Sequence, residues 1–178
     1  MKYFSLILLT VFSFSLFAKG ASTTSSINTD VLPLYSKVYD DTRDPFEDAL
    51  AAIDLASKTN RNVLIEIGGT WCTWCHKMDA FLEKNPDVYQ ALHQEFVVLK
   101  VSVSDSNENE AFMKGLPPVL GYPHMYVSTS KGKMLLSKDT AELQENGEYV
   151  KPNWLAFIAQ WKPSSTNASL SQTASQGQ

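Results

Sequence analysis

Hydrophobic and polar residues follow one another along this chain with the two periods that distinguish helices from strands. Helical spacing predicts helices over 45–58, from the cysteines to 84, over 86–94 and over 152–161, with a shorter one over 105–114. Short apolar runs predict strands over 62–67, 96–103, 125–128 and 133–136, the last two around a Ser-Lys-Gly hairpin signal. Because strands and helices alternate and a hairpin follows, we predict an α/β fold with a central mixed β-sheet flanked by helices on both faces.

The first of these helices has a recognisable start. Asp44 is predicted to cap it and Pro45 to occupy its first position, where proline's missing N–H is tolerated. Phe46, Leu50 and Ile53 then recur at helical spacing.

The two ends of the chain differ from its middle. Residues 1–20 carry Lys2, then an apolar run broken only by Ser and Thr, then small residues, a pattern typical of a cleaved secretory signal peptide. A membrane anchor is the alternative, but the apolar run has only about fifteen residues where a span needs about 20. We predict a lead-in over 21–44, one domain over 45–162 and a flexible polar tail over 163–178.

The formal net charge of the whole chain is −4, and the sequence contains no basic run. Nucleic acid and anionic membrane surfaces are therefore not expected partners, and we expect no stable membrane insertion after signal cleavage. Export would place the protein in the periplasm or outside the cell, where an oxidising environment lets a disulfide persist.

The chain holds two cysteines, Cys72 and Cys75, where a predicted strand gives way to a predicted helix. A Cys-x-x-Cys in this setting indicates redox chemistry. At the N-terminus of a helix, free backbone N–H groups and the helix dipole favour a thiolate. We therefore expect Cys72 to attack a substrate disulfide and Cys75 to resolve the mixed disulfide by forming a Cys72–Cys75 disulfide.

Three other interpretations of the cysteine pair are open. A purely structural disulfide would close a ring so small that it removes little entropy from the unfolded chain. A zinc site would need two more ligands, and the chain offers only His76, His93 and His124 and no further cysteine, so we expect no metal. Residues 72–76 also fit the Cys-x-x-Cys-His pattern of covalent c-type haem attachment, and alone they do not decide between haem and thiol exchange.

Over residues 45–162 the chain resembles the thioredoxin superfamily, especially its secreted bacterial thioredoxin-like members. The resemblance rests on four features in the right order: a strand followed by Trp71 and the Cys-x-x-Cys, Glu66 six residues before the first cysteine, Lys100 on the next strand, and Gly121-Tyr122-Pro123-His124 before the hairpin. It implies a thioredoxin-like fold, and it implies that Tyr122-Pro123 is a cis-proline loop lying beside the cysteines.

The resemblance also implies roles for these residues. Glu66 would move protons to and from Cys75, and Lys100 would pair with Glu66. A solvent-facing Glu66 on an edge strand and a surface Lys100 are the alternatives. Tyr122 would offer its backbone groups to an extended substrate held at Pro123.

Two tryptophans and two histidines complete the set of residues around the motif. Trp71 and Trp74 would form an apolar rim for substrate, with Trp71 expected partly packed and Trp74 exposed. His76 would either help to stabilise the thiolate or lie in solvent. His93 is expected to be a surface residue of its helix.

Together these observations favour an exported thiol–disulfide oxidoreductase that acts on protein thiols and disulfides, needs no separate cofactor and depends on a membrane redox partner. The intervening pair Thr73-Trp74 leaves the direction open between reductase, oxidase and isomerase. A non-catalytic thioredoxin-fold binding or chaperone module is one alternative. A c-type haem protein is another, although haem attachment accounts for neither Glu66, Lys100 nor the Gly-Tyr-Pro loop.

Overall fold

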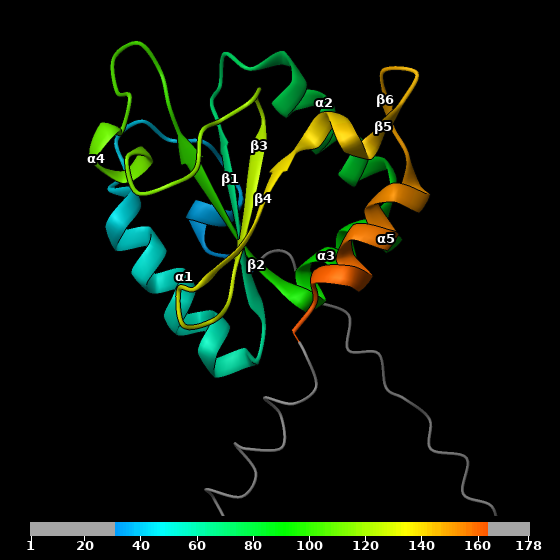
Figure 1. Ribbon diagram of the computed structural model, residues 1–178, viewed down its shortest axis with the longest axis horizontal. Helices are drawn as coiled ribbons and strands as arrows, with labels where there is room; N and C mark the ends of the chain where they lie inside the picture. Colours follow the sequence, from blue (N-terminus) through cyan, green and yellow to red (C-terminus); the bar gives the residue numbers. More distant parts are fainter. Residues whose placement is uncertain (1–30, 164–178) are drawn as a thin grey trace, which may run out of the picture.

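The structure of the protein is a computed structural model that describes residues 31–163. The predicted signal peptide at 1–20, the lead-in up to residue 30 and the tail from residue 164 lie outside the described residues. Figure 1 shows the central sheet running through the middle of the described part, with α-helices on either side of it.

The predicted helices and strands are confirmed in type and order. In chain order the elements are η2 (Leu34–Ser36), α1 (Pro45–Thr59), β1 (Asn62–Gly68), α2 (Thr73–Lys84), α3 (Pro86–Glu95), β2 (Phe96–Ser102), α4 (Glu110–Met113), β3 (His124–Ser128), β4 (Met134–Asp139), η3 (Thr140–Leu143), β5 (Gln144–Glu145), β6 (Glu148–Tyr149) and α5 (Lys151–Trp161). The helix expected over 105–114 is reduced to the short α4. Asn107 and Asn109 donate side-chain hydrogen bonds to backbone carbonyls and so hold the preceding residues as a loop.

The central sheet is mixed, as predicted, with the strand order β2-β1-β3-β4. β1 runs parallel to β2 and antiparallel to β3, and β3 pairs antiparallel with β4. In this register Glu66 of β1 stands opposite Lys100 of β2. Every residue of β1 is buried, so a solvent-facing Glu66 on an edge strand is excluded.

Two hydrophobic clusters fill the two faces of the sheet. On one face, α1 and α4 pack against strand residues that include Val63 and Ile65. On the other face, α2, α3 and α5 pack against Leu64 and Val98. Successive residues of a strand point to opposite faces, so Glu66 shares the face of Leu64, on the side that α2 covers.

Helix α1 begins as predicted, but it buries a different face from the one its large apolar residues suggest. The Asp44 carboxylate accepts a hydrogen bond from the Phe46 backbone N–H at 2.8 Å and caps the helix. Phe46 and Leu50 are nevertheless exposed, while Ala52 and Ala56 are fully buried. Small alanines let the helix approach the sheet closely, and the larger side chains remain on its outer side.

Residues ahead of α1 also pack on the sheet. Tyr35, Ser36 and Tyr39 are buried, and the Ser36 hydroxyl donates a hydrogen bond to the Val98 carbonyl of β2. The short helix η2 therefore lies along the outer edge of β2, and the folded part of the chain begins before residue 45.

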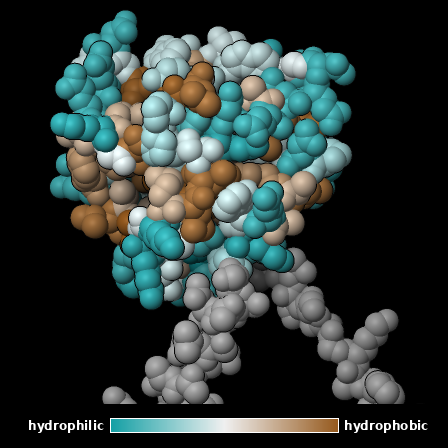
Figure 2. All heavy atoms as spheres, in the orientation of Figure 1, coloured by the Kyte–Doolittle hydropathy of each residue, from teal (hydrophilic) through white to brown (hydrophobic). Residues whose placement is uncertain are grey.

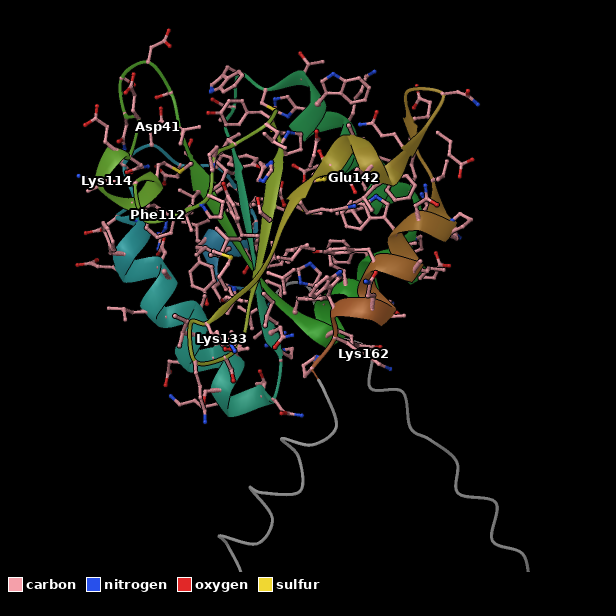
Figure 3. All side chains as sticks on the ribbon, in the orientation of Figure 1. Asp41, Phe112, Lys114, Lys133, Glu142 and Lys162 are labelled. Atoms are coloured by element: carbon pink, nitrogen blue, oxygen red, sulfur yellow. A yellow bond between two sulfur atoms is a disulfide. The ribbon has the colours of Figure 1, made fainter. Side chains whose placement is uncertain are left out.

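The polar stretch 139–151 packs over the α2 side of the sheet. It forms η3 and the two-stranded hairpin of β5 and β6, and it buries Leu143 and Tyr149 in the core. Figure 3 labels Glu142 in this stretch, on the opposite side of the sheet from Asp41 and Phe112. This stretch and α4 therefore flank the sheet from opposite sides (Figure 1).

On the face seen in Figure 2, hydrophobic residues gather in separate patches among hydrophilic ones. Within residues 31–163, no helix has the combined length and hydrophobicity that crossing a membrane requires.

Candidate active site

A disulfide between Cys72 and Cys75 stands where β1 gives way to α2. Cys72 is the N-cap residue of α2, and its sulfur accepts a hydrogen bond from the Cys75 backbone N–H at 3.1 Å. The exposed fraction is 3% for Cys72 and 0% for Cys75, so both are buried and Cys72 is the sulfur nearer the surface. The helix N-terminus is also where a thiolate on Cys72 would be stabilised once the disulfide is reduced.

The last residue of β1 brings a tyrosine hydroxyl up to the second sulfur. A Cβ atom on Gly68 would lie 2.5 Å from the Cys75 sulfur and 2.7 Å from the Tyr39 hydroxyl oxygen. Both distances are too short for any side chain, so this position needs glycine. Because both atoms crowd the same point, the Tyr39 hydroxyl lies beside the Cys75 sulfur.

Glu66 is the centre of a buried polar network behind the disulfide. Its carboxylate accepts a hydrogen bond from the Tyr39 hydroxyl, and its Oε1 lies 3.9 Å from Nζ of Lys100. Lys100 donates to the Asp79 carboxylate at 2.6 Å. The side chains of Glu66 and Lys100 are 3% and 7% exposed, against 42% for Asp79, so Lys100 is no surface lysine and the network reaches solvent through Asp79.

The network sets the protonation of its members. Burial raises the pKa of the Glu66 carboxyl, the Lys100 ammonium partly opposes this, and the result lies above the ordinary value. Burial would lower the pKa of Lys100, but the carboxylates of Glu66 and Asp79 outweigh it, so that pKa is raised. Burial and the Glu66 charge raise the pKa of Tyr39 well above its ordinary value. At neutral pH Tyr39 therefore keeps its proton, and Lys100 stays charged.

Asp79 and Lys100 line a cavity of about 540 Å³ that also reaches Glu66. The cavity lies on the α2–α3 side of the sheet, since Leu82 and Tyr89 also line it. A proton released at Glu66 therefore has a route to solvent that does not pass the disulfide.

The loop before β3 has the backbone form that the resemblance implied. The Tyr122–Pro123 peptide bond is cis, and the Thr140 hydroxyl donates to the Pro123 carbonyl at 2.7 Å. The Tyr122 ring meets the Trp71 ring edge-on, with 5.2 Å between centroids. This contact places the loop next to the residue that precedes Cys72.

The two tryptophans reverse the expected pattern of exposure. Trp71 is 54% exposed, with its indole N–H donating to the Val103 carbonyl at 2.6 Å. Trp74 is half-buried because its ring packs edge-on against the ring of Tyr149, which belongs to the stretch 139–151. The apolar rim beside the disulfide therefore consists of Trp71 and Tyr122.

The histidines also differ from expectation. His76 is exposed and its Nε2 donates to the Thr70 carbonyl at 2.8 Å. His93 was expected on the surface but is 3% exposed, because α3 packs it inward against the Tyr89 ring. Burial, aided by the Arg61 charge, lowers the pKa of His93 to about 4. Among residues 31–163, no three His, Cys, Asp or Glu side chains gather in a way that would hold a metal ion.

Residues 13–117 match the family model Thioredox_DsbH, described as a protein of unknown function, DUF255. The chain belongs to this thioredoxin-like family. The resemblance to the thioredoxin superfamily and the predicted fold class are thereby confirmed.

Individual relatives of the chain are also thiol–disulfide proteins by name. A protein disulfide-isomerase of Hordeum vulgare is 30% identical over 100 residues, which are 56% of this chain and 18% of that protein. The chain thus matches less than a fifth of that relative's length. A disulphide isomerase structure from Xylella fastidiosa Temecula1 is 24% identical, with a TM-score of 0.57 over 72% of this chain and 95% of that one. The oxidised C-terminal domain of DsbD from Neisseria meningitidis is 20% identical, with a TM-score of 0.53 over 70% of this chain and 99% of that one. Both solved structures share the fold.

Two residues of the candidate site were not predicted from the sequence. Asp79 follows Cys75 by four residues on α2, a spacing that places two side chains on one helix face and that signals such a neighbour. Tyr39 gave no such signal, since it precedes Glu66 by 27 residues in a segment without periodic pattern. Of the predicted residues, Glu66 and Lys100 lie opposite each other in the sheet, and Tyr39, which donates to Glu66, packs in the same cluster as Cys72 and Cys75.

Proposed function

We propose that this protein is an exported thiol–disulfide oxidoreductase that exchanges disulfides with protein substrates through Cys72 and Cys75. One observation supports this most directly: the disulfide caps α2 with Cys72 outermost, while Cys75 lies against the Tyr39 hydroxyl that is bonded to Glu66. A disulfide that served only as a staple would gain nothing from a buried acid behind its inner sulfur.

In the reducing direction, the Cys72 thiolate attacks one sulfur of a client disulfide. The client S–S bond breaks, one client sulfur leaves as a thiolate that takes up a proton, and a mixed disulfide joins Cys72 to the other. Cys75 then loses its proton and attacks the Cys72 sulfur, which releases the second client thiol and reforms the Cys72–Cys75 disulfide. Two electrons pass to the client, and a dithiol donor must restore the pair. The reverse sequence oxidises a client dithiol.

The resolving step needs a base for the Cys75 proton. The Tyr39 hydroxyl already donates to Glu66, so its oxygen is free to accept the Cys75 proton while its own proton passes to the carboxylate. A raised pKa equips Glu66 to hold that proton. Lys100 and Asp79 then connect Glu66 to solvent.

Insulin reduction by a thiol donor tests the proposal, with Cys72→Ala and Cys75→Ala as the variants. Cys72→Ala should abolish turnover, because the sulfur nearer the surface is removed. Cys75→Ala should trap mixed disulfides with clients on non-reducing gels, because resolution is lost. Activity that survives both changes would sink the proposal, and trapping by Cys72→Ala instead would reverse the two roles.

The small exposure of Cys72 favours one other candidate, a non-catalytic binding or chaperone module in which the disulfide only locks the loop. The same variants separate the two functions. A binding module should suppress aggregation of an unfolded client equally well with and without its cysteines. A c-type haem protein has no comparable support, since haem attachment gives no role to Glu66, Lys100 or the Gly-Tyr-Pro loop.

The place of action and the redox partner are further parts of the proposal. The pattern over residues 1–20 supports export to the periplasm or beyond, and an exported exchanger needs a membrane partner that reduces or re-oxidises it. Cell fractionation with N-terminal sequencing of the mature protein tests export. The reduction potential of the Cys72–Cys75 pair, measured against glutathione, decides between reductase and oxidase.

A further inference from the structure

Beside the disulfide lies a groove of about 990 Å³ whose near end is formed by Trp71 and Tyr122. Met113, Leu116 and neighbouring prolines give it further apolar lining. Asp105 and Glu108, from the loop between β2 and α4, and Glu110, the first residue of α4, line the same groove. We name it the acidic groove. It adjoins the disulfide because Trp71 both precedes Cys72 in sequence and lines the groove.

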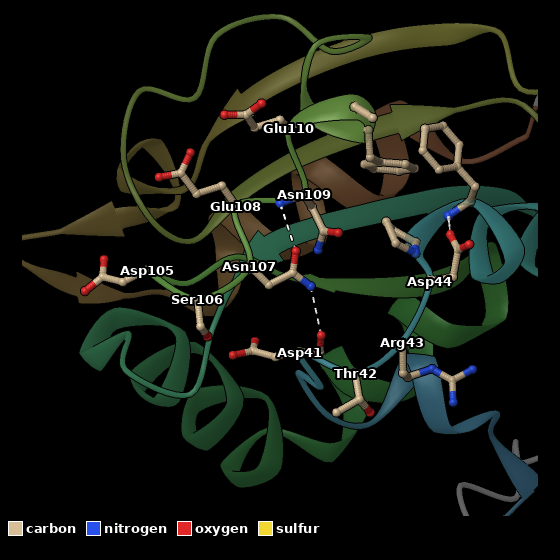
Figure 4. A pocket seen from close by; sticks show the side chains of 14 residues that line it. Asp41, Thr42, Arg43, Asp44, Asp105, Ser106, Asn107, Glu108, Asn109 and Glu110 are labelled. Atoms are coloured by element: carbon tan, nitrogen blue, oxygen red, sulfur yellow. Dashed lines mark hydrogen bonds between the residues drawn. The ribbon is translucent and has the colours of Figure 1, made fainter.

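The three acids of the acidic groove carry uncompensated charge. All three are exposed, and none forms an ion pair with another described residue. The three acids also line a neighbouring pocket together with Arg43. Figure 4, a view of that pocket, shows Asp105, Glu108 and Glu110 extending away from Arg43, and Arg43 is paired with Asp48. Lysine and arginine are absent from the groove lining.

The loop that presents these acids is held in place. The Asn107 side chain donates to the Asp41 carbonyl at 2.8 Å (Figure 4), and the Asn109 side chain donates to the Ser102 carbonyl at 2.6 Å. A fixed loop presents its charges to a partner without an ordering cost at the moment of binding.

We propose that the acidic groove binds the client segment that flanks the reacting cysteine, and that it selects segments with an apolar side chain followed by Lys or Arg. The inference rests on the proposed function and goes beyond backbone pairing at Tyr122-Pro123. Charge complementarity identifies the client as basic, because carboxylates at an interface favour cationic side chains and repel acidic ones. Continuity with Trp71 and Tyr122 identifies it as the same polypeptide whose disulfide reacts at Cys72.

The test uses short peptides that contain one cysteine, followed by Leu-Lys-Lys, Gly-Lys-Lys or Leu-Glu-Glu. A disulfide joins this cysteine to a neutral thiol reporter. The Cys72–Cys75 disulfide is first reduced and the free reductant removed, so that each protein molecule supplies the two electrons for one turnover. The rate of reporter release then gives the second-order rate constant for each peptide at low and high salt. The double variant Glu108→Gln/Glu110→Gln is compared with Glu145→Gln/Glu148→Gln, which makes the same chemical and charge change on the β5–β6 hairpin. The hairpin and α4 lie on opposite sides of the sheet (Figure 1).

The native protein should favour the Leu-Lys-Lys peptide over Leu-Glu-Glu by about tenfold at low salt, and over Gly-Lys-Lys by a smaller factor. Glu108→Gln/Glu110→Gln should remove most of the charge preference, while the hairpin variant should keep it. High salt should shrink the preference in the native protein. The proposal for the acidic groove would be overturned if the two double variants preferred Leu-Lys-Lys over Leu-Glu-Glu equally, or if the native protein showed no such preference. Failure to release the reporter from any peptide, or from a small neutral disulfide, would instead overturn the proposed function.

Discussion

At the scale of single residues, Tyr39 tells most about how a proton could pass between Cys75 and Glu66. Its hydroxyl donates a hydrogen bond to the buried Glu66 carboxylate, and its side chain packs in the same cluster as the two cysteines. A tyrosine whose pKa lies well above the ordinary value is a poor base on its own, but it conducts a proton well when it accepts one and releases another in the same step. The proposed proton transfer therefore needs Tyr39 and Glu66 together.

Tyr39→Phe should slow the resolving step by about tenfold or more, because Cys75 loses its direct path to Glu66. The first attack by Cys72 should keep its rate. Stopped-flow reduction of a peptide disulfide separates the two steps, and the mixed disulfide should accumulate in the variant. The pH dependence of resolution should also change, which a purely structural role would not produce.

Tyr35→Phe is the matched control for that measurement, since Tyr35 is also buried in the segment ahead of α1 and makes no hydrogen bond to Glu66. Equal slowing in the two variants would show that packing, not proton transfer, is lost.

Some residues of the candidate site could be predicted from their positions in the sequence, and others reach the site only through contacts made in the folded protein. Glu66 and Lys100 could be predicted because the family resemblance places an acid and a lysine on successive strands, and the parallel pairing of β1 with β2 sets them opposite each other. The exposures of Trp71 and Trp74 could not, because Tyr149 covers Trp74 from more than seventy residues away in the sequence. Tyr39 belongs to the same class of long-range contact.

At the scale of elements, the residue ranges of the helices could be predicted better than the faces that they bury. A cap and a proline mark the start of α1 in the sequence itself, so Asp44 and Pro45 were sufficient to place it. Which face lies inward depends on how closely the helix approaches the sheet, and Ala52 and Ala56 decide this more than Leu50 does.

Asp44→Ala should lower the free energy of unfolding by about 1 kcal/mol, because the first-turn N–H groups of α1 lose their acceptor. Thermal unfolding followed by circular dichroism should show Tm lower by roughly 2–4 °C.

Asp54→Ala serves as the comparison for the cap. It removes only the exposed ion pair with Lys58 on the same helix, so it should cost at most about 0.5 kcal/mol. An equal loss in both variants would contradict a capping role for Asp44.

At the scale of the whole molecule, His93 couples stability to acidity. Its pKa is about 4 in the folded protein and about 6.5 in an unfolded chain. Between these values the unfolded chain binds a proton that the folded protein does not. Stability from this group is therefore complete above pH 6.5 and is lost as pH falls toward 4.

Urea unfolding at pH 7 and pH 4.5 measures this loss. His93→Leu should remove about 2–3 kcal/mol of the pH-dependent fall in stability, while acidic groups that titrate in both proteins cancel in the comparison. His76→Leu, which changes an exposed histidine, should leave the fall intact. A native-like fall in His93→Leu would mean that His93 is charged in the fold.

The position of η2 has a consequence for self-association of the protein at high concentration. The strand order leaves β2 at one margin of the central sheet, and Ser36 satisfies the outward carbonyl of Val98 there. A bare margin of this kind templates the addition of strands from other molecules. Residues 34–36 cover this edge and so oppose such pairing. A chain truncated from the N-terminus through Ser36 would keep its cysteines but should aggregate through the exposed edge of β2.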